Sequence, residues 1–326
     1  MRRDTLLKNE LVVFLLAMLC CLLWGSAFPC IKIGYELFGI VKDDVYTQIL
    51  YAGMRFFLAG ILAVTIGSVQ AKKLLIPKKT AWIMVAKLSL FQTILQYLFF
   101  YIGLANTTGV KASIIEGSNV FVAILVAGFV FHQEKVTLRK MLGCLAGFAG
   151  VVLVNLGGEG LVMTFRLNGE GFIFFSTMAY AVSSALLKRY SQKENTVMLS
   201  GYQFAFGGLV MMLVGLTGGG RIAGFGSALI ESADGAHFTA AGLAMLVYLA
   251  FVSATAYSLW GILLKYNPVS KISVYGFMNP VFGVILSAIL LNEQNGALGA
   301  GRIIIALCLV GAGILIINVH GKERDV

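Results

Sequence analysis

Glu116 is the residue whose type and position point most directly to chemistry. It lies about eight residues into a strongly apolar segment, so its carboxylate would sit about 12 Å along a helix that rises roughly 1.5 Å per residue. A carboxylate at that depth in a membrane usually faces a cavity or a charged partner. Ser113, Asn119 and Ala123 recur with it at spacings of three and four, which places all four on one helix face. This stripe could exchange a proton at Glu116 or hold a substrate amine, or Glu116 could simply join two helices through a salt bridge.

Arg55 is the natural candidate partner for Glu116. It lies about nine residues into its own apolar segment, which we expect to run in the same direction, so the two charges should lie at similar depth. A salt bridge between them would lower the cost of burying both, and it would hold Glu116 ionised and disfavour proton coupling. The alternative for Arg55 is an extended side chain that reaches the headgroups.

Amide and aromatic side chains in other segments could complete a binding cavity. Such a set suits a small amphipathic or cationic molecule, through hydrogen bonds and cation–π contacts. Each aromatic residue could instead belong to the core or to the membrane interface, whereas amides in lipid are expected between helices. These candidates are Trp24, Gln96, Tyr97, Tyr101, Tyr180, Gln203, Tyr257, Trp260, Tyr275 and Asn279.

The composition requires a nonpolar solvent around much of the chain. Of 326 residues, 59% are hydrophobic and only 12% are charged, and the mean hydropathy is +0.88. Soluble domains are nearer half apolar and a quarter charged. Segments of about 20 apolar residues can cross a bilayer as helices. Ten are predicted, near 11–31, 46–69, 81–105, 109–131, 138–157, 170–189, 200–217, 240–262, 269–291 and 297–318.

The positive charge predicts topology rather than nucleic-acid binding. The net charge is +10, but most lysines and arginines fall in alternate loops, on the side that includes the N-terminus. This asymmetry places both termini in the cytoplasm of a multi-pass protein of the inner or plasma membrane, with basic side chains against anionic lipid headgroups. No nucleic-acid partner is expected, because no basic patch with a reading element is present.

The second five segments resemble the first five. Ser113 to Asn119 matches Ser273 to Asn279 at the same spacing, Trp24 matches Tyr180, and Arg55 matches Gln203. We therefore expect two five-helix units, residues 1–158 and 168–320. Because each has an odd number of helices, the two would be inverted across the membrane, which is the arrangement that permits alternating access.

These features resemble the ten-helix, EamA-type members of the drug/metabolite transporter superfamily. The resemblance rests on Trp24-Gly25-Ser26, Arg55-Phe56, Gln96 to Gly103 with Lys111-Ala112-Ser113, and Asn279-Pro280-Val281-Phe282 leading to Glu293. One departure is that Pro280 has no counterpart in the matching segment of the first half, where Val120 stands. The resemblance implies an all-α secondary transporter that exports metabolites such as amino acids, or amine and drug-like solutes.

The residues leave few other functions open. The scattered cysteines and histidines predict no metal or other cofactor, and no GxxxxGK[ST] loop indicates use of ATP. An enzyme is not expected, because no catalytic constellation lies at membrane depth. The alternatives are a lipid-translocating or scaffold protein. Proton antiport, the substrate and its direction remain open, as do monomer and homodimer, because the glycines of 143–150 and 311–313 permit close helix contact in either.

Overall fold

The fold is known from a computed structural model that describes residues 3–41, 43–107, 109–155, 165–222, 240–290 and 300–318. This part of the chain forms helices and contains no strand. The predicted unit ends at 158 and 320, and Glu293, which was named in the resemblance, lie outside the described residues.

The helices follow the apolar segments closely, and several are divided by short π- or 3-10-helical turns. The first half contains α1 (Arg3–Leu6), α2 (Glu10–Leu37), α3 (Val45–Ala71), α4 (Ala81–Leu88), η1 (Ser89–Leu95), α5 (Gln96–Ala105), α6 (Gly109–Gly117), α7 (Asn119–Leu125), η2 (Val126–Val130) and α8 (Leu138–Asn155). The second half contains η3 (Leu167–Gly171), α9 (Phe172–Ser191), α10 (Thr196–Thr217), α11 (Ala240–Tyr266), α12 (Val269–Ser273), η4 (Val274–Phe277), α13 (Met278–Leu290) and α14 (Ala300–Asn318).

Eight of the described helical stretches are long and apolar enough to cross a membrane, and Ile303–Asn318 forms a shorter apolar helix. Many of their large apolar side chains point outward, among them Leu15, Ile61, Phe129 and Leu213. A soluble protein would bury such a surface, so this exposure indicates a lipid environment. The chain is therefore a multi-pass membrane protein.

Short polar residues mark where several helices begin. The side chain of Asn9 accepts hydrogen bonds from the amides of Leu11 and Val12 at the start of α2, at 3.0 and 3.3 Å. Asn195 accepts one from Met198 at the start of α10, at 3.0 Å. These caps satisfy amides that the helix leaves unpaired, and they fix each helix start immediately before an apolar run.

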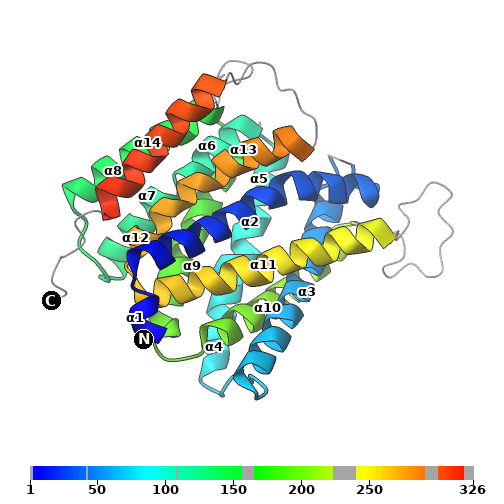
Figure 1. Cartoon of the computed structure of the whole chain (residues 1–326). Helices are drawn as coiled ribbons and strands as arrows, with labels where there is room; N and C mark the ends of the chain where they lie inside the picture. The colour runs from blue at the N-terminus through cyan, green and yellow to red at the C-terminus, as the bar shows by residue number, and fades with distance from the viewer. Residues whose placement is uncertain are drawn as a thin grey trace.

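Helices α3 and α10 form the closest long contact in the molecule (Figure 1). Glycines make this contact possible, because a Cβ added to Gly53 would lie 2.6 Å from the Met212 amide, and one added to Gly208 would lie 2.8 Å from the Gly53 carbonyl oxygen. Gly215 contacts Leu50 and Gly60 contacts Ala205, so the residue number falls along α10 as it rises along α3, and the two helices are antiparallel. Small residues are what let membrane helices approach this closely.

A second glycine contact joins α8 and α14, which lie side by side at one edge of the bundle (Figure 1). A Cβ added to Gly143 would lie 3.0 Å from the carbonyl oxygen of Gly313, and one added to Gly150 would lie 2.8 Å from that of Ala306. Gly143, Gly150 and Gly313 thus pack within the monomer at this contact, whereas no atom lies within 4 Å of a Cβ added to Gly311.

Two stretches that match in sequence are also interrupted at matching places. Ser118 separates α6 from α7, and its hydroxyl donates to the Ile115 carbonyl at 2.6 Å. In the other half, the 3-10 turn η4 separates α12 from α13. Broken helices inside a membrane are tolerated where they line a cavity, and both breaks lie beside the cavity described next.

Candidate functional site

One cavity, of about 1120 Å³ with its open mouth included, lies among α2, α3, α5, α6, α9, α11 and α13. Its wall combines charged, amide, hydroxyl and aromatic side chains. The wall residues are Trp24, Ala27, Phe28, Ile31, Arg55, Gln96, Tyr97, Phe100, Tyr101, Ser113, Glu116, Gly117, Asn119, Tyr180, Val252, Ser253, Tyr257, Gly276, Asn279 and Pro280.

The polar stripe predicted around Glu116 lies largely on this wall. Ser113, Glu116 and Asn119 line the cavity from α6 and the start of α7, whereas Ala123 is buried in the core. Glu116 is half-buried, and no described residue donates a hydrogen bond to its carboxylate or forms an ion pair with it. The stripe therefore presents a carboxylate to the cavity.

Arg55 reaches the same cavity from α3 but does not pair with Glu116. Its side chain is held by aromatic rings: the guanidinium carbon lies 4.4 Å from the centre of the Phe56 ring and 5.8 Å from that of Tyr97. Only 4% of the residue is exposed, and its Nε has no hydrogen-bond partner. Among the described residues Arg55 forms no salt bridge with Glu116 and does not extend to the surface, and it lies at the cavity, which is the other position expected for a charge at this depth.

Aromatic residues build the rest of the wall, and they are fixed by contacts with one another. The hydroxyls of Tyr97 and Tyr257 share a hydrogen bond of 2.7 Å. Trp24 packs edge-on against Tyr257, with ring centres 5.0 Å apart. These contacts connect α2, α5 and α11 and leave the ring faces to shape the cavity.

Several polar atoms of wall residues have no hydrogen-bond partner among the described residues. Besides Arg55 Nε, they are Trp24 Nε1, Gln96 Oε1 and Asn279 Oδ1. Buried polar atoms are rarely left unpaired, because each unmade hydrogen bond costs about 1–3 kcal/mol. These four atoms have almost no accessible surface, so in this conformation they lie behind the wall and do not open onto the cavity.

Three predicted site residues lie away from the cavity. Gln203 is fully buried, where its Oε1 accepts from Thr93 Oγ1 at 2.7 Å and its Nε2 donates to Gln92 Oε1 at 3.1 Å. Trp260 and Tyr275 are buried in an apolar cluster. The spacing of residues along a helix could not show which face meets the cavity and which meets a neighbouring helix.

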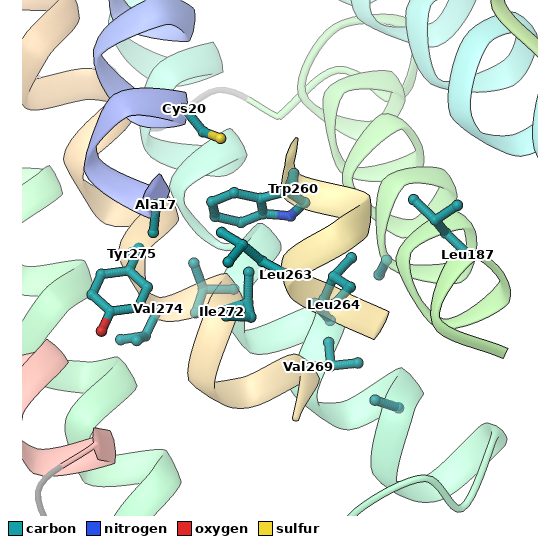
Figure 2. Packing of buried hydrophobic residues seen from close by; sticks show 14 of the residues in the cluster. Ala17, Cys20, Leu187, Trp260, Leu263, Leu264, Val269, Ile272, Val274 and Tyr275 are labelled. Atoms are coloured by element: carbon teal, nitrogen blue, oxygen red, sulfur yellow. The ribbon is translucent and has the colours of Figure 1, made fainter. Parts of the chain in front are cut away.

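Part of that apolar cluster adjoins the cavity wall (Figure 2). Trp260 lies edge-on to Trp24 of the wall, with ring centres 5.0 Å apart, and Leu263 lies beside Trp260 in the view. The residues labelled in Figure 2 come from α2, α9, α11, α12 and η4, and they are Ala17, Cys20, Leu187, Trp260, Leu263, Leu264, Val269, Ile272, Val274 and Tyr275. We call these ten residues the plug.

Polar contacts lie beyond the plug, at the end of the bundle where α2 and α12 begin. Glu134 accepts from the Ser270 amide at 2.9 Å and from the Ser270 hydroxyl at 2.5 Å, and it pairs with Lys140 at 3.1 Å. Glu10 pairs with Lys271 at 2.6 Å. Both sets of contacts tie the first half of the chain to the segment around α12.

A separate set of contacts lies at the opposite end of the bundle. Glu170 accepts hydrogen bonds from Lys111 at 3.0 Å, from the Thr107 hydroxyl at 2.8 Å and from the Arg166 amide at 2.8 Å. Because Lys111 belongs to α6, this carboxylate attaches the helix that carries Glu116 to the start of the second half.

Comparison with known proteins places the chain in a family. The pattern of the EamA-like transporter family matches residues 11–156 and again 167–319. The chain belongs to the EamA-like transporter family. This confirms the resemblance drawn from the sequence, and transport by a multi-pass membrane protein is the role it supports.

Relatives of this EamA-like chain are described mainly as transporters. An uncharacterized transporter of Archaeoglobus fulgidus is 29% identical over 86% of this chain and 89% of its own length. An uncharacterized transporter of Bacillus subtilis is 24% identical over 93% and 90%. A chloroplastic WAT1-related protein of Arabidopsis thaliana is 23% identical over 88% and 66%. A crystal structure at 17% identity shares the fold with a TM-score of 0.72, over 95% of this chain and 98% of the other.

Both matched parts of the EamA-like chain contribute to the cavity. Asn119 and Asn279, which correspond in the internal repeat, both reach the wall, and so do Trp24 and Tyr180. The sequence did not single out Phe28, Phe100 or Ser253, because apolar and small hydroxyl residues are common in every apolar segment. Their position on the wall follows only from how the helices are rotated.

Proposed function

We propose that this protein is a secondary transporter that exports small organic solutes by alternating access. In this proposal it has ten spans, in two inverted units of five, and it binds its solute in the cavity that contains Arg55 and Glu116. The observation that carries the proposal is a polar and aromatic cavity inside a membrane protein, with the plug in contact with its wall through Trp260 and Trp24. A site of this kind near mid-depth, bordered by two interrupted helices, is typical of secondary transporters.

The positions of the wall residues along their helices indicate to which side of the membrane the cavity opens. On α2 they run from Trp24 to Ile31, on α5 from Gln96 to Tyr101, and on α11 from Val252 to Tyr257. The stretches on α2 and α5 extend toward the end of the bundle opposite to Glu10, Lys140 and Lys271, whereas the stretch on α11 lies near the middle of its helix. The positive-inside rule assigns that basic end to the cytoplasm of the cell membrane. We infer that both termini are cytoplasmic and that the cavity opens outward.

Glu116 is our candidate for coupling transport to protons. It faces a solvated cavity in a membrane protein, where carboxylates commonly exchange protons. Proton entry from the side with the higher proton concentration would then drive solute in the opposite direction. The absence of an ion pair with Arg55 in the described structure leaves the carboxylate accessible for this role.

The test uses purified protein in liposomes with an imposed pH gradient. A panel of amino acids and organic cations is added while solute uptake and proton flux are recorded. We expect at least one solute to move and to drive proton flux, and we expect Glu116→Gln to abolish that flux while the protein remains monodisperse. Solute flux without proton movement in either protein would refute coupling through Glu116 but not transport.

A blocked cavity provides the control for the transport route. Ala27→Trp places an indole on the wall, whereas Leu243→Trp places one on an exposed face of α11. We expect the first variant to lose transport and the second to retain it. Equal transport by both variants, or no movement of any solute by the wild-type protein, would contradict the proposed function.

A further inference from the structure

We propose that the protein binds an anionic phospholipid of the cytoplasmic leaflet in a second cavity, apart from the transport site. In this arrangement the phosphate of the lipid contacts Asn195, Thr196 and Lys265, and the start of an acyl chain lies on the apolar part of the wall. This inference goes beyond the proposed function, because the second cavity shares no wall residue with the first.

The second cavity lies at one end of the bundle and measures about 450 Å³ with its open mouth included. It is bordered by the start of α10 at Thr196, by the end of α11 at Tyr266, and by Leu7, which follows α1. Asn267 joins these parts, because its Nδ2 donates to the Leu7 carbonyl oxygen at 3.0 Å. This is the end of the bundle at which Lys271 lies, and the positive-inside rule assigns it to the cytoplasm. A cavity at these helix ends lies at the depth of the lipid headgroups.

The charges around this cavity favour an anion. Lys265 is on the wall, and no carboxylate of the described chain forms an ion pair with it. Its ammonium lies 5.7 Å from the centre of the Tyr266 ring, which attracts a cation without neutralising it. Lys8 and Lys193 lie within two residues of the wall along the chain, against one carboxylate, that of Glu194. The field at the mouth of the cavity is therefore positive.

Two uncharged side chains add hydrogen-bond donors to the same wall. Asn195 caps α10, and because its Oδ1 accepts from the Met198 amide at 3.0 Å, its Nδ2 is left as a donor. Thr196 is only 5% exposed, yet its hydroxyl forms no hydrogen bond with a described residue. Its methyl group packs toward α11, since a Cβ added to Gly261 would lie 2.6 Å from Thr196 Cγ2. A buried hydroxyl without a partner costs free energy, and an anion that accepts from it would offset that cost.

A phosphate can use all three of these donors at once. Its oxygens are strong acceptors, and lysine is a common point-charge partner for it. The start of α10, a helix of 22 residues, lies at the same place, and the unpaired amides and dipole at the start of a helix attract phosphate groups.

The rest of the wall indicates that this phosphate belongs to a lipid. Leu7, Val197 and Ile262 line the cavity with apolar side chains, and Leu6 beside them exposes 42% of its surface. A free phosphate would leave these side chains in contact with water, whereas the first carbons of an acyl chain would cover them. Basic pockets between membrane helices at the cytoplasmic face are typical sites for lipid headgroups.

Two lipids with the same acyl chains test the requirement for negative charge. Dioleoylphosphatidylglycerol is anionic, whereas dioleoylphosphatidylcholine has a phosphate but no net charge. Native mass spectrometry of the purified full-length protein measures how much of each lipid is retained as its concentration is raised. We expect the phosphatidylglycerol to bind at least about fivefold more tightly, because each basic side chain near the membrane surface attracts anionic lipid. Inorganic phosphate is added as a competitor, and it should not displace the lipid.

Two variants test the contacts with the headgroup. We expect Lys265→Gln to weaken phosphatidylglycerol at least about tenfold, and Thr196→Val, which keeps the volume and removes the hydroxyl, to weaken it about fivefold. Lys79→Gln is the matched control, because it removes an exposed charge from the same end of the bundle, between α3 and α4. It should change the affinity by less than about twofold, since exposed charges act only weakly. Thermal unfolding checks that each variant is folded.

Three results would overturn the inference. Equal binding of the two lipids would remove the role of negative charge. Equal losses in Lys265→Gln and Lys79→Gln, with no loss in Thr196→Val, would indicate a general attraction to the basic end rather than a site. Displacement of the lipid by inorganic phosphate would assign the cavity to a soluble anion. Each of these results would leave transport through the first cavity untouched.

Discussion

Phe56 and Phe204 stack at the contact between α3 and α10, with ring centres 5.3 Å apart and ring planes inclined by 11°. They occupy matching places in the two halves of the chain. The residues immediately before them differ, because Arg55 lines the cavity whereas Gln203 is buried with Gln92 and Thr93. The stacked pair thus marks a point where the two halves share a packing position, whereas only one of the residues before the pair faces the cavity.

Substitution of Gln203 should therefore reduce stability without changing solute affinity, whereas substitution of Arg55 should reduce solute affinity. Gln203→Met leaves Thr93 and Gln92 without their partner, and we expect it to reduce stability by about 1–3 kcal/mol because buried polar groups become unpaired. Solute affinity should not change. Thermal unfolding and calorimetry on both variants check this, and loss of affinity in a folded Gln203→Met protein would show that Gln203 contributes to binding.

The glycines at the contact between α3 and α10 should not tolerate replacement by residues with larger side chains. Gly53→Leu would place atoms against the Met212 backbone, and we expect it to cost about 1–3 kcal/mol or to prevent folding, as overpacking does. Gly311→Leu is the matched control, because no atom lies within 4 Å of an added Cβ there. Detergent-purified yield and melting temperature report the result, and similar losses in both variants would point to a general intolerance of glycine substitution.

Glu134 should stabilise the state in which the plug is closed. Glu134→Gln removes the ion pair with Lys140 and weakens the contacts with Ser270, so we expect a smaller fraction of outward-open protein. A cysteine at Ser253 on the wall, in a Cys308→Ser background, can be labelled from outside with an impermeant thiol reagent. Labelling should be slower with Glu134→Gln, and an unchanged rate would argue against this role.

Glu170 should affect solute affinity only indirectly, by holding α6 in position. We expect Glu170→Gln to lower the melting temperature, since the carboxylate accepts hydrogen bonds from Lys111, Thr107 and the Arg166 amide. Because α6 carries Glu116, the affinity for phenethylamine, which carries an ammonium group, should fall more than the affinity for 3-phenylpropionate, which carries a carboxylate. Calorimetry on the two probes tests this, and equal losses for both would instead indicate a general loosening of the cavity.

Much of the fold could be predicted from the sequence, because lipid imposes long apolar helices on any chain that crosses it. The described helices lie where the apolar segments were expected, and the family membership agrees with the resemblance. The position of Glu116 on a cavity wall could also be anticipated, since a carboxylate has few other places at that depth. In both cases one cost dominates, namely the free energy of placing unpaired polar backbone groups or a charge in lipid.

The remaining parts of the site depend on helix rotation, which no single segment determines. Gln203 and Arg55 have matching positions along matching helices, yet only Arg55 faces the cavity. Tyr275 lies in the 3-10 turn η4, whose tighter winding changes which residues share a face, and it is buried near Phe14. Spacings of three and four assume a regular α-helix, and they lose their meaning at such an interruption.

The plug also has an electrical consequence. An aqueous cavity carries the potential of its own side inward, so a membrane voltage falls mainly across the dry cluster around Trp260 and Leu263. In the proposed outward-open state Arg55 and Glu116 would sit close to the external potential, and voltage would act on a solute chiefly during its passage between these apolar side chains. A singly charged amine would exchange about 2.3 kcal/mol with the field per 100 mV, whereas a zwitterion has no net charge and would pass at almost no electrical cost.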